Sequence, residues 1–189
     1  YLEACEESVG VIAESLGCYG ESRDILAVKG WGSKYMHQGQ LSGDTSWDFL
    51  GQEIFKKAVS GMAQACEKTL AKAEKSADDI DVVVPHQANL RIIDTLAKKL
   101  QLNKERVFVN IERYGNMSAA TALVALVEAV EEGKIQPNQW VLMPAFGGGL
   151  TWSAHLIKWG ERVHALQTTQ KTLPPCDKTG LGIIADYRT

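Results

Sequence analysis

The stretch IDVVVPHQANLRI, residues 80–92, decides how the rest of the chain is interpreted. Residues 80–84 form a short and nearly continuous apolar run, which is typical of a strand buried on both faces of a parallel sheet. Pro85 ends this run. An apolar stripe at helical spacing follows, formed by Leu90, Ile93, Ala97 and Leu100. A buried strand that leads directly into an amphipathic helix is the repeating unit of an α/β fold.

The same unit recurs before and after this stretch. A strand is predicted at residues 9–16, and a helix with one apolar face begins near residue 55. The residues of that face lie three or four positions apart: Phe55, Val59, Met62, Cys66, Leu70 and Ala73. A further strand, predicted at residues 107–111, precedes a helix at about residues 118–131. The chain therefore alternates strands and helices over most of its length.

Two strands, predicted at residues 140–143 and 150–159, complete the pattern. The connection between them is too short for a crossover helix, so they are expected to pair antiparallel. The sequence therefore predicts an α/β fold of βαβαβαββ order, doubly wound, with a mixed five-stranded sheet and one antiparallel edge.

The helix predicted at residues 118–131 is apolar almost all round. Its apolar residues are Ala119, Ala120, Ala122, Leu123, Val124, Leu126 and Val127. A helix of this kind is buried on every side, so it is expected to lie between two sheets. The chain supplies only one sheet, which predicts a second layer that is missing from it.

The composition excludes several classes of protein. The chain has 189 residues, of which 45% are hydrophobic and 23% charged, as is ordinary for a soluble globular domain. A net charge of −3 favours neither nucleic acid nor an anionic membrane as a partner. No apolar run reaches transmembrane length, and the first residues contain neither an initiator Met nor a signal peptide. We therefore expect a cytoplasmic protein whose chain is entered partway through.

The cysteines and histidines do not predict a metal site. The four cysteines, at positions 5, 18, 66 and 176, have neither CxxC nor metal-site spacing and are expected to be reduced thiols. Cys66 lies on a helix's apolar face, as a small buried hydrophobe would. No two histidines have the spacing of ligands, so we assign no metal.

Two segments depart from the alternating pattern. Residues 17–48 combine six glycines with Tyr19, Trp31, Tyr35 and Trp47. A glycine-rich, aromatic loop of that length either borders a binding site or is a packed surface excursion. Residues 164–189, which include Pro174-Pro175, are expected to form a C-terminal extension.

Three short motifs each follow a predicted strand: PHQAN (85–89), YGNMS (114–118) and FGGG (146–149). In an open α/β sheet, ligands bind at the carboxyl ends of the strands. Hydrogen-bond donors that converge there can hold a developing negative oxygen. The motifs therefore predict carbonyl chemistry.

His86 is the first candidate donor. A lone histidine after a strand is more often structural than catalytic. Residues 87–89 are predicted to begin a helix, whose dipole would oppose protonation of the imidazole. A neutral imidazole can donate one N–H to a carbonyl oxygen, as an electrophile in enolate chemistry does. Asn89 is either a further site residue or only a helix-start residue.

Asn116 and the glycine run have plainer alternatives as well. Asn116 could serve only as the N-cap of the helix that follows it. A dinucleotide fingerprint opens a helix, whereas residues 147–149 lead into a strand, so a nucleotide-binding domain is disfavoured. A tight hairpin is the plain alternative for these glycines, but they would also let a backbone amide approach a substrate closely.

Together, PHQANLRI (85–92), ERYGNMSAA (112–120) and AFGGGLTW (145–152) closely resemble β-ketoacyl-acyl-carrier-protein synthase III. This family contains the initiating condensing enzymes of type II fatty acid biosynthesis, and the resemblance covers about residues 9–161. It implies the thiolase-like fold, in which two similar halves pack as αβαβα layers.

The resemblance also implies a domain organisation. Residues 9–163 would be the C-terminal thiolase-like domain, residues 1–8 the end of the preceding N-terminal half, and residues 164–189 an extension. Because that first half is absent, the second layer missing beside the helix at residues 118–131 would be supplied by it.

Individual residues acquire roles from the same resemblance. His86 and Asn116 match the pair that binds the malonyl thioester carbonyl and stabilises the enolate, and Gly148 matches the amide of the oxyanion hole. Phe55 and Asn89 match positions near the pantetheine arm. The basic surface that receives the acyl carrier protein corresponds to Lys56, Arg91, Lys98 and Lys99. A cluster of this kind also suits electrostatic docking of an acidic partner.

The implied reaction needs no cofactor, because its substrates are acyl-CoA and malonyl-acyl-carrier-protein. The implied partners are the acyl carrier protein, acyl-CoA and the missing N-terminal half, in an enzyme that is a homodimer when complete.

Two positions depart from the family pattern. Met117 stands where the family commonly has Thr. The resemblance places the nucleophilic cysteine in the first half, and no residue of this chain matches it. By pseudo-symmetry, the counterpart of that cysteine in this half is Asn116. We therefore expect an acyltransferase half that is inactive alone. The alternative is a non-catalytic subunit that binds an acyl thioester or carrier protein within a heterodimer.

Overall fold

The computed structural model describes residues 8–28, 30, 33–37, 39–164 and 177–186. The prediction for residues 1–8 therefore concerns residues outside this set, except for Ser8, as does most of the prediction for the C-terminal extension. Within the extension, Gly180–Asp186 forms a short helix, α5.

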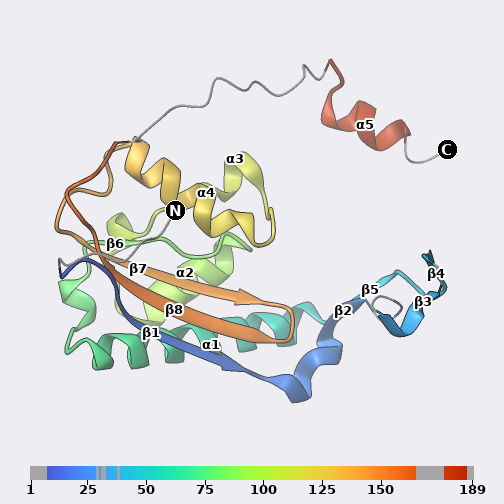
Figure 1. Cartoon of the computed structure of the whole chain (residues 1–189), viewed down its shortest axis with the longest axis horizontal. Coiled ribbons are helices and arrows are strands. Elements are labelled where there is room, and N and C mark those ends of the chain that lie inside the picture. The colour runs from blue at the N-terminus through green and yellow to red at the C-terminus, as the bar shows by residue number, and fades with distance from the viewer. Residues whose placement is uncertain (1–7, 29, 31–32, 38, 165–176, 187–189) are drawn as a thin grey trace.

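A mixed four-stranded sheet forms the centre of the fold (Figure 1). The strands are β1 (Gly10–Cys18), β6 (Val82–Val83), β7 (Trp140–Gly147) and β8 (Thr151–Lys158), in the spatial order β1-β8-β7-β6. β6 and β7 are parallel, whereas β8 pairs antiparallel with both β7 and β1. The predicted α/β class and the antiparallel pairing of the last two strands are thus confirmed.

Helices cover both faces of this sheet. α1 (Gly51–Lys72) and α2 (Leu90–Lys99) lie on one face, and α4 (Ala120–Glu131) lies on the other (Figure 1). The short helix α3 (Ile111–Tyr114) precedes α4. None of the helices in the described part of the chain is both long and apolar enough to cross a membrane.

Alternate residues of the strands pack into two separate cores. Val83 and Leu142 belong to the core formed with α1 and α2. Their neighbours Val82 and Val141 belong to the core formed with α4. The apolar run that precedes Pro85 is therefore buried on both faces, as the sequence predicts.

The predicted strand at residues 107–111 is wrong, and with it the count of five strands. One isolated parallel bridge, between Val83 and Val107, joins this segment to the sheet. The backbone N–H of Asn110 donates instead to Oε1 of Gln87 at 3.1 Å. α3 begins at the next residue, Ile111. A further strand beside β6 would need a free backbone N–H at Asn110 and an extended backbone after it, and this segment provides neither.

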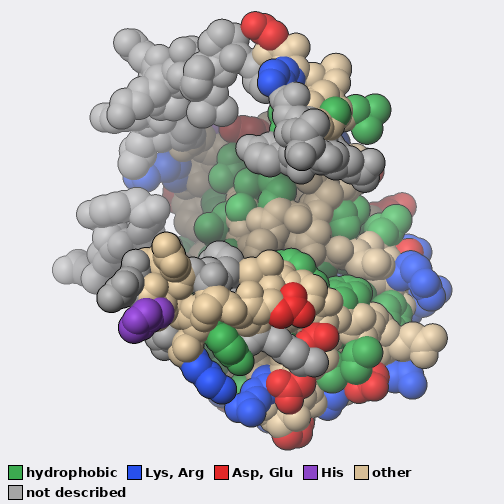
Figure 2. Space-filling view, turned by 90° about the vertical axis from the view of Figure 1, so that its right-hand side faces the viewer, with side chains coloured by type: hydrophobic (Ala, Val, Ile, Leu, Met, Phe, Trp, Pro, Cys, Tyr) green, Lys and Arg blue, Asp and Glu red, His purple; other side chains and the backbone are tan. Residues whose placement is uncertain are grey.

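α4 is buried on one side only. Ala125 and Ala129 are fully buried in the core, whereas Leu123 is 63% exposed and Val127 is 54% exposed. The predicted burial on every side is therefore not met within this chain. Hydrophobic side chains also gather in the middle of the face that Figure 2 shows, above a mixture of acidic and basic side chains.

Residues 17–48 do not form one continuous loop. β1 continues to Cys18, and the rest contains two small antiparallel pairs that lie away from the central sheet (Figure 1). The paired strands are β2 (Leu26–Val28) with β5 (Trp47–Phe49), and β3 (Met36–His37) with β4 (Gln40–Leu41). Trp47 and Phe49 of β5 are exposed. Short 3₁₀ helices are η1 (Gly20–Ile25), η2 (Ser33–Tyr35), η3 (Ala77–Asp79) and η4 (Lys104–Arg106).

The start of β8 is fixed by two glycines. A Cβ at Gly17 of β1 would lie 2.0 Å from Cη2 of Trp152, and one at Gly61 of α1 would lie 2.5 Å from its Cδ1. Only glycine allows the indole to pack this closely against both elements. The packed ring holds the β7–β8 hairpin against α1, beside the glycine run.

Candidate functional site

His86 lies at the carboxyl end of β6, where the sheet meets the first turn of α4. Its backbone N–H donates to the carbonyl of Pro144 on β7 at 2.9 Å. Its ring nitrogen Nδ1 forms a short hydrogen bond with Oγ1 of Thr121. The side chain is half-buried, and this burial lowers the pKa of His86 below its usual value. A neutral imidazole is therefore favoured near neutral pH.

The predicted cause of that neutrality is wrong, although the neutrality itself agrees with the direction of the pKa shift. Residues 87–89 do not begin a helix: α2 begins at Leu90, four residues after His86. Asn89 is the N-cap, and its Oδ1 accepts the backbone N–H of Arg91 at 2.9 Å. The effect of a helix dipole falls off within the first turn, so burial rather than the dipole lowers the pKa of His86.

Asn116 is held in a turn that precedes α4. Its Oδ1 accepts the backbone N–H of Ser118 at 2.9 Å, which leaves the amide nitrogen as the donor end of the side chain. α4 begins at Ala120 with Ala119 as its N-cap, so Asn116 is not the cap of that helix. The carbonyl of Ser118 lies 3.1 Å from Oγ1 of Thr121. Thr121 thus connects the turn that carries Asn116 with His86.

Gly148 lies in the turn between β7 and β8, which confirms that the glycine run closes a hairpin. The last pair of the ladder is Gly147 with Thr151. A Cβ placed at Gly148 would meet no atom within 4 Å, so the backbone there is open to approach. Its assignment to an oxyanion hole stays a prediction.

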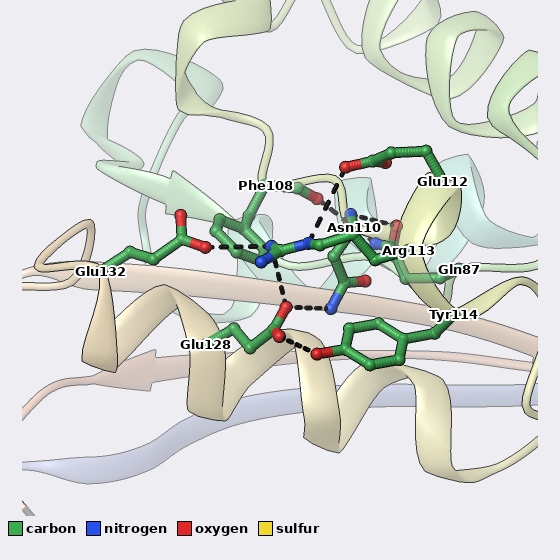
Figure 3. A network of polar contacts seen from close by, with 8 residues as sticks. All are labelled: Gln87, Phe108, Asn110, Glu112, Arg113, Tyr114, Glu128 and Glu132. Carbon is green, nitrogen blue, oxygen red and sulfur yellow. Dashed lines mark hydrogen bonds and ion pairs between the residues drawn. The ribbon is translucent and has the colours of Figure 1, made fainter. Parts of the chain in front are cut away.

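A cluster of polar side chains anchors the segment before Asn116 to α4 (Figure 3). We call it the Glu128 cluster, since three donors converge on the carboxylate of Glu128. Nδ2 of Asn110 donates at 2.8 Å, a guanidinium nitrogen of Arg113 lies at 2.9 Å, and the hydroxyl of Tyr114 forms a short hydrogen bond. Arg113 also donates to Glu132 at 2.9 Å. Glu128 belongs to α4 and Glu132 is its C-cap, whereas all three donors belong to α3 or its N-cap.

Gln87 links this cluster to His86. The side chain is fully buried, and its Nε2 donates to the carbonyls of Pro85 at 2.8 Å and Phe108 at 3.3 Å. Its Oε1 accepts the backbone N–H of Asn110, as described above. Its own backbone N–H donates to Oγ1 of Thr121 at 3.2 Å. One connected set of hydrogen bonds therefore spans both candidate donors.

Three further residues of the site were not predicted from the sequence: Gln87, Thr121 and Glu128. Two of them carried a usable signal, because Gln87 follows a buried strand and Thr121 interrupts an apolar helix. A polar side chain in such a place is hydrogen-bonded in most proteins. Glu128 gave no signal, because a glutamate on a helix is ordinary.

We expect Glu128→Gln to lower the melting temperature at pH 7 more than Glu132→Gln does. The hydrogen bonds from Tyr114 and Asn110, together with nearby Arg113, lower the pKa of Glu128. A carboxyl whose pKa is lower in the folded state contributes stability above its unfolded pKa, and this contribution is lost as pH falls through the folded pKa. The difference between wild type and Glu128→Gln should therefore shrink in acid.

Thermal melts of the three proteins at pH 7 and at about pH 3.5, just below the ordinary Glu pKa, measure this effect. Glu132→Gln is the matched control, because it makes the same change at the C-cap of α4, four residues after Glu128, and Glu132 contacts only Arg113 of the cluster. Equal losses for the two variants at pH 7 would show that Glu128 is not the anchor.

The structure brings some of the predicted surface residues together and separates others. The guanidinium of Arg91 lies over the ring of Phe55, 5.7 Å from its centroid, so these two residues are neighbours across α1 and α2. Lys56 is exposed beside Phe55. Lys98 and Lys99 are exposed in the last turn of α2, about 11 Å along the helix axis from Arg91. The basic residues therefore form a strip along α2, with its amino-terminal end at Phe55.

Cys66 is an inert thiol, and the described cysteines and histidines form no metal site. Cys66 is fully buried, and desolvation raises the pKa of its thiol to about 12, which confirms that it is a small buried hydrophobe. Cys18 is exposed, while Cys5 and Cys176 lie outside the described residues. Among the residues that the structure describes, no three His, Cys, Asp or Glu side chains come together as a metal site would require.

Comparison with known proteins identifies the family of this chain. The family model of the 3-oxoacyl-[acyl-carrier-protein] synthase III C-terminal domain matches residues 70–159. β-Ketoacyl-[acyl-carrier-protein] synthase III 2 of Vibrio cholerae is 46% identical over 184 residues, which cover 97% of this chain and 51% of that protein. The synthase III of Roseiflexus sp. is 45% identical over 160 residues, covering 84% of this chain and 49% of that protein.

Solved structures give the same result. The 3-oxoacyl-[acyl-carrier-protein] synthase III of Aquifex aeolicus aligns with a TM-score of 0.72 at 38% identity, over 82% of this chain and 46% of that one. The synthase III of Thermus thermophilus aligns with a TM-score of 0.74 at 39% identity, over 83% of this chain and 48% of that one.

The fold is that of a thiolase-like half-domain of the α/β class. The chain spans about half the length of the curated relatives it matches. It belongs to the 3-oxoacyl-[acyl-carrier-protein] synthase III family, in which it corresponds to the C-terminal half.

Proposed function

We propose that this chain is the C-terminal half of a decarboxylating β-ketoacyl-acyl-carrier-protein synthase III. The complete enzyme would condense an acyl group, taken from acyl-CoA, with malonyl-acyl-carrier-protein in fatty acid biosynthesis. The observation that carries the proposal is the joining of His86 to the Asn116 turn through Thr121 at the end of the sheet. Two neutral donors that converge on one place would suit an oxygen that becomes negative during a reaction.

The first half-reaction needs a residue from outside this chain. A cysteine thiolate of the N-terminal half attacks the acyl-CoA carbonyl, and CoA leaves as its thiolate. Cys66 does not suit that role, because it is buried and the pKa of its thiol is raised. The amide of Gly148, in the open turn between β7 and β8, would help to hold the tetrahedral oxyanion.

The second half-reaction uses His86 and Asn116. The bond between the malonyl α-carbon and its carboxylate breaks, carbon dioxide leaves, and the electron pair forms a thioester enolate. Nε2–H of His86 and the amide nitrogen of Asn116 would donate to the enolate oxygen. The enolate carbon then attacks the acyl-enzyme carbonyl, forming the new C–C bond and releasing the cysteine thiolate. A neutral His86, favoured by its burial, donates without competing for the proton.

Substrate delivery would involve α1 and α2. Phe55 and Asn89 would lie beside the pantetheine arm, and Arg91 stacks on Phe55 at the same place. The basic strip along α2 would receive the acidic carrier protein at the surface.

We expect the combined charge reversal Arg91→Glu, Lys98→Glu and Lys99→Glu to lower the association rate with the carrier protein by about tenfold or more at low salt. These exposed cations act by long-range attraction, which salt screens within about 10 Å at 0.1 M. The loss should therefore shrink as salt is added. Surface plasmon resonance at several salt concentrations measures it.

Lys134→Glu is the control for this measurement, because Lys134 is an exposed cation beyond the end of α4 and outside the strip. An unchanged association rate for the triple variant at low salt, or an equal loss for Lys134→Glu, would remove the docking assignment.

The coding sequence upstream of Tyr1 offers an independent test. An in-frame thiolase-like half that contains a cysteine at the start of its own central helix is the expected result. A separate gene for the first half would favour a heterodimer instead, and a cysteine-free partner would favour a binding subunit.

A further inference from the structure

Thr121 occupies an unusual position for a helix residue. It lies in the first turn of α4, it is fully buried, and it faces the ring of His86. Its hydroxyl oxygen lies within hydrogen-bond distance of three groups: Nδ1 of His86, the backbone N–H of Gln87 and the carbonyl of Ser118. A hydroxyl has one proton to donate, so these three contacts cannot be served independently.

The proton of Thr121 has two possible acceptors, with opposite consequences. If it goes to the carbonyl of Ser118, then Nδ1 of His86 must carry a proton and donate to Thr121, and Nε2 has a lone pair. If it goes to Nδ1, then the proton of the neutral ring is on Nε2. The backbone N–H of Gln87 fits either case, because it can only donate.

The carbonyl of Ser118 does not need the hydroxyl. It already accepts the backbone N–H of Thr121 at 3.2 Å, and Ser118 is exposed, so water can reach it. Nδ1 of His86 is in a different position, because its ring is half-buried and Thr121 is the partner that the structure gives it. The hydroxyl proton is therefore better placed on Nδ1.

We propose that Thr121 is a positioning residue that donates its hydroxyl proton to Nδ1 of His86 and so keeps the imidazole in the tautomer with Nε2–H. The proposal rests on the proposed function, because a donor to the enolate oxygen is needed only there. It assigns a role to the one side chain that connects both halves of the donor pair. Thr121→Val removes the proton while keeping the shape, and Thr121→Ser keeps the proton.

The test is the protonation of each ring nitrogen of His86, measured by magic-angle-spinning NMR on the full chain labelled with ¹⁵N-histidine. This method does not require the protein to tumble freely, and no substrate is added. The pH is about 8, above the ordinary histidine pKa of about 6.5, so the ring is neutral. His86→Gln identifies the resonances. Thr69→Val is the matched control, because Thr69 is also a fully buried helical threonine, and its hydroxyl donates to the carbonyl of Ala154 at 3.3 Å.

In wild type, Thr121→Ser and Thr69→Val, we expect the proton on Nε2 and the lone pair on Nδ1. In Thr121→Val we expect a mixture of the two tautomers. A wild-type proton on Nδ1 would overturn the proposal, as would a Thr121→Val spectrum identical to that of wild type.

Activity separates this proposal from the proposed function. In the complete enzyme, Thr121→Val should lower malonyl decarboxylation by about tenfold or more, in the range found for residues that orient another ligand or base, and Thr121→Ser should restore it. Acylation of the cysteine should not change. Suppose that the proton is found on Nε2 of His86, but that neither the wild-type complete enzyme nor any variant decarboxylates a malonyl thioester. The proposed function then fails, while the role of Thr121 toward His86 stands.

Discussion

His86→Ala should lower malonyl decarboxylation by about a hundredfold or more while the cysteine of the complete enzyme is acylated at its wild-type rate. The reason is that the negative oxygen stabilised by His86 exists only after carbon dioxide leaves. Interactions made only in one transition state affect only that step. The measurements are carbon dioxide release from malonyl-acyl-carrier-protein and acyl transfer from acyl-CoA, made on the same preparation.

His155→Ala is the control for this prediction. His155 lies on β8, where its Nε2 is 3.6 Å from a carboxylate oxygen of Glu14, and it takes no part in the hydrogen bonds around His86. This variant should retain both half-reactions. If His86→Ala lowered acylation and decarboxylation together, His86 would be activating the nucleophile rather than holding the enolate.

The parts of the fold that depend on local pattern could be predicted from the sequence. The spacing of apolar residues located α1, because a long helix repeats its signal over many turns. The short connection between the last two strands fixed their antiparallel pairing, since no crossover fits. His86 follows β6, as the strand-end argument predicts, whereas Asn116 follows α3 and not a strand. The Asn116 turn meets His86 through Thr121.

The errors arose where side chains compete with the backbone. Residues 107–111 have the composition of a strand, but the side-chain Oε1 of Gln87 accepts the backbone N–H of Asn110 and ends the pairing. The start of α2 was placed three residues early, because Asn89 satisfies the first turn as a cap and residues 87–88 stay outside the helix. Such contacts join residues distant in sequence, so no local pattern contains them.

The supporting residues of the site could not be read from the sequence for the same reason. Glu128 matters because Asn110, Arg113 and Tyr114 reach it from a neighbouring segment (Figure 3). A helix wheel shows Glu128 only as a charge on an apolar helix. Its role depends on where α3 lies against α4, which is a property of the tertiary fold.

This chain alone should form no acyl-enzyme, and it should self-associate through the exposed side of α4. Leu123 and Val127 are more than half exposed on a helix whose other side is in the core, and apolar surface of that kind drives association. Leu123→Lys with Val127→Lys should therefore reduce self-association of the isolated chain, measured by analytical ultracentrifugation. The same two substitutions should weaken assembly with an N-terminal half added in trans. The reason is that the side of α4 that drives self-association would also be the side that binds the N-terminal half.

Radiolabelled acyl-CoA supplies the decisive measurement on the isolated chain. We expect no stable, stoichiometric label on any of Cys5, Cys18, Cys66 or Cys176, and turnover only after the N-terminal half is added. Cys66 is the clearest case, since a thiol with a pKa raised to about 12 and no exposed surface is neither ionised nor reachable by a thioester. Denaturing the chain before labelling provides the control, because it makes every thiol accessible. Stoichiometric labelling of one cysteine in the folded chain would place the nucleophile here and overturn the interpretation as a half-enzyme.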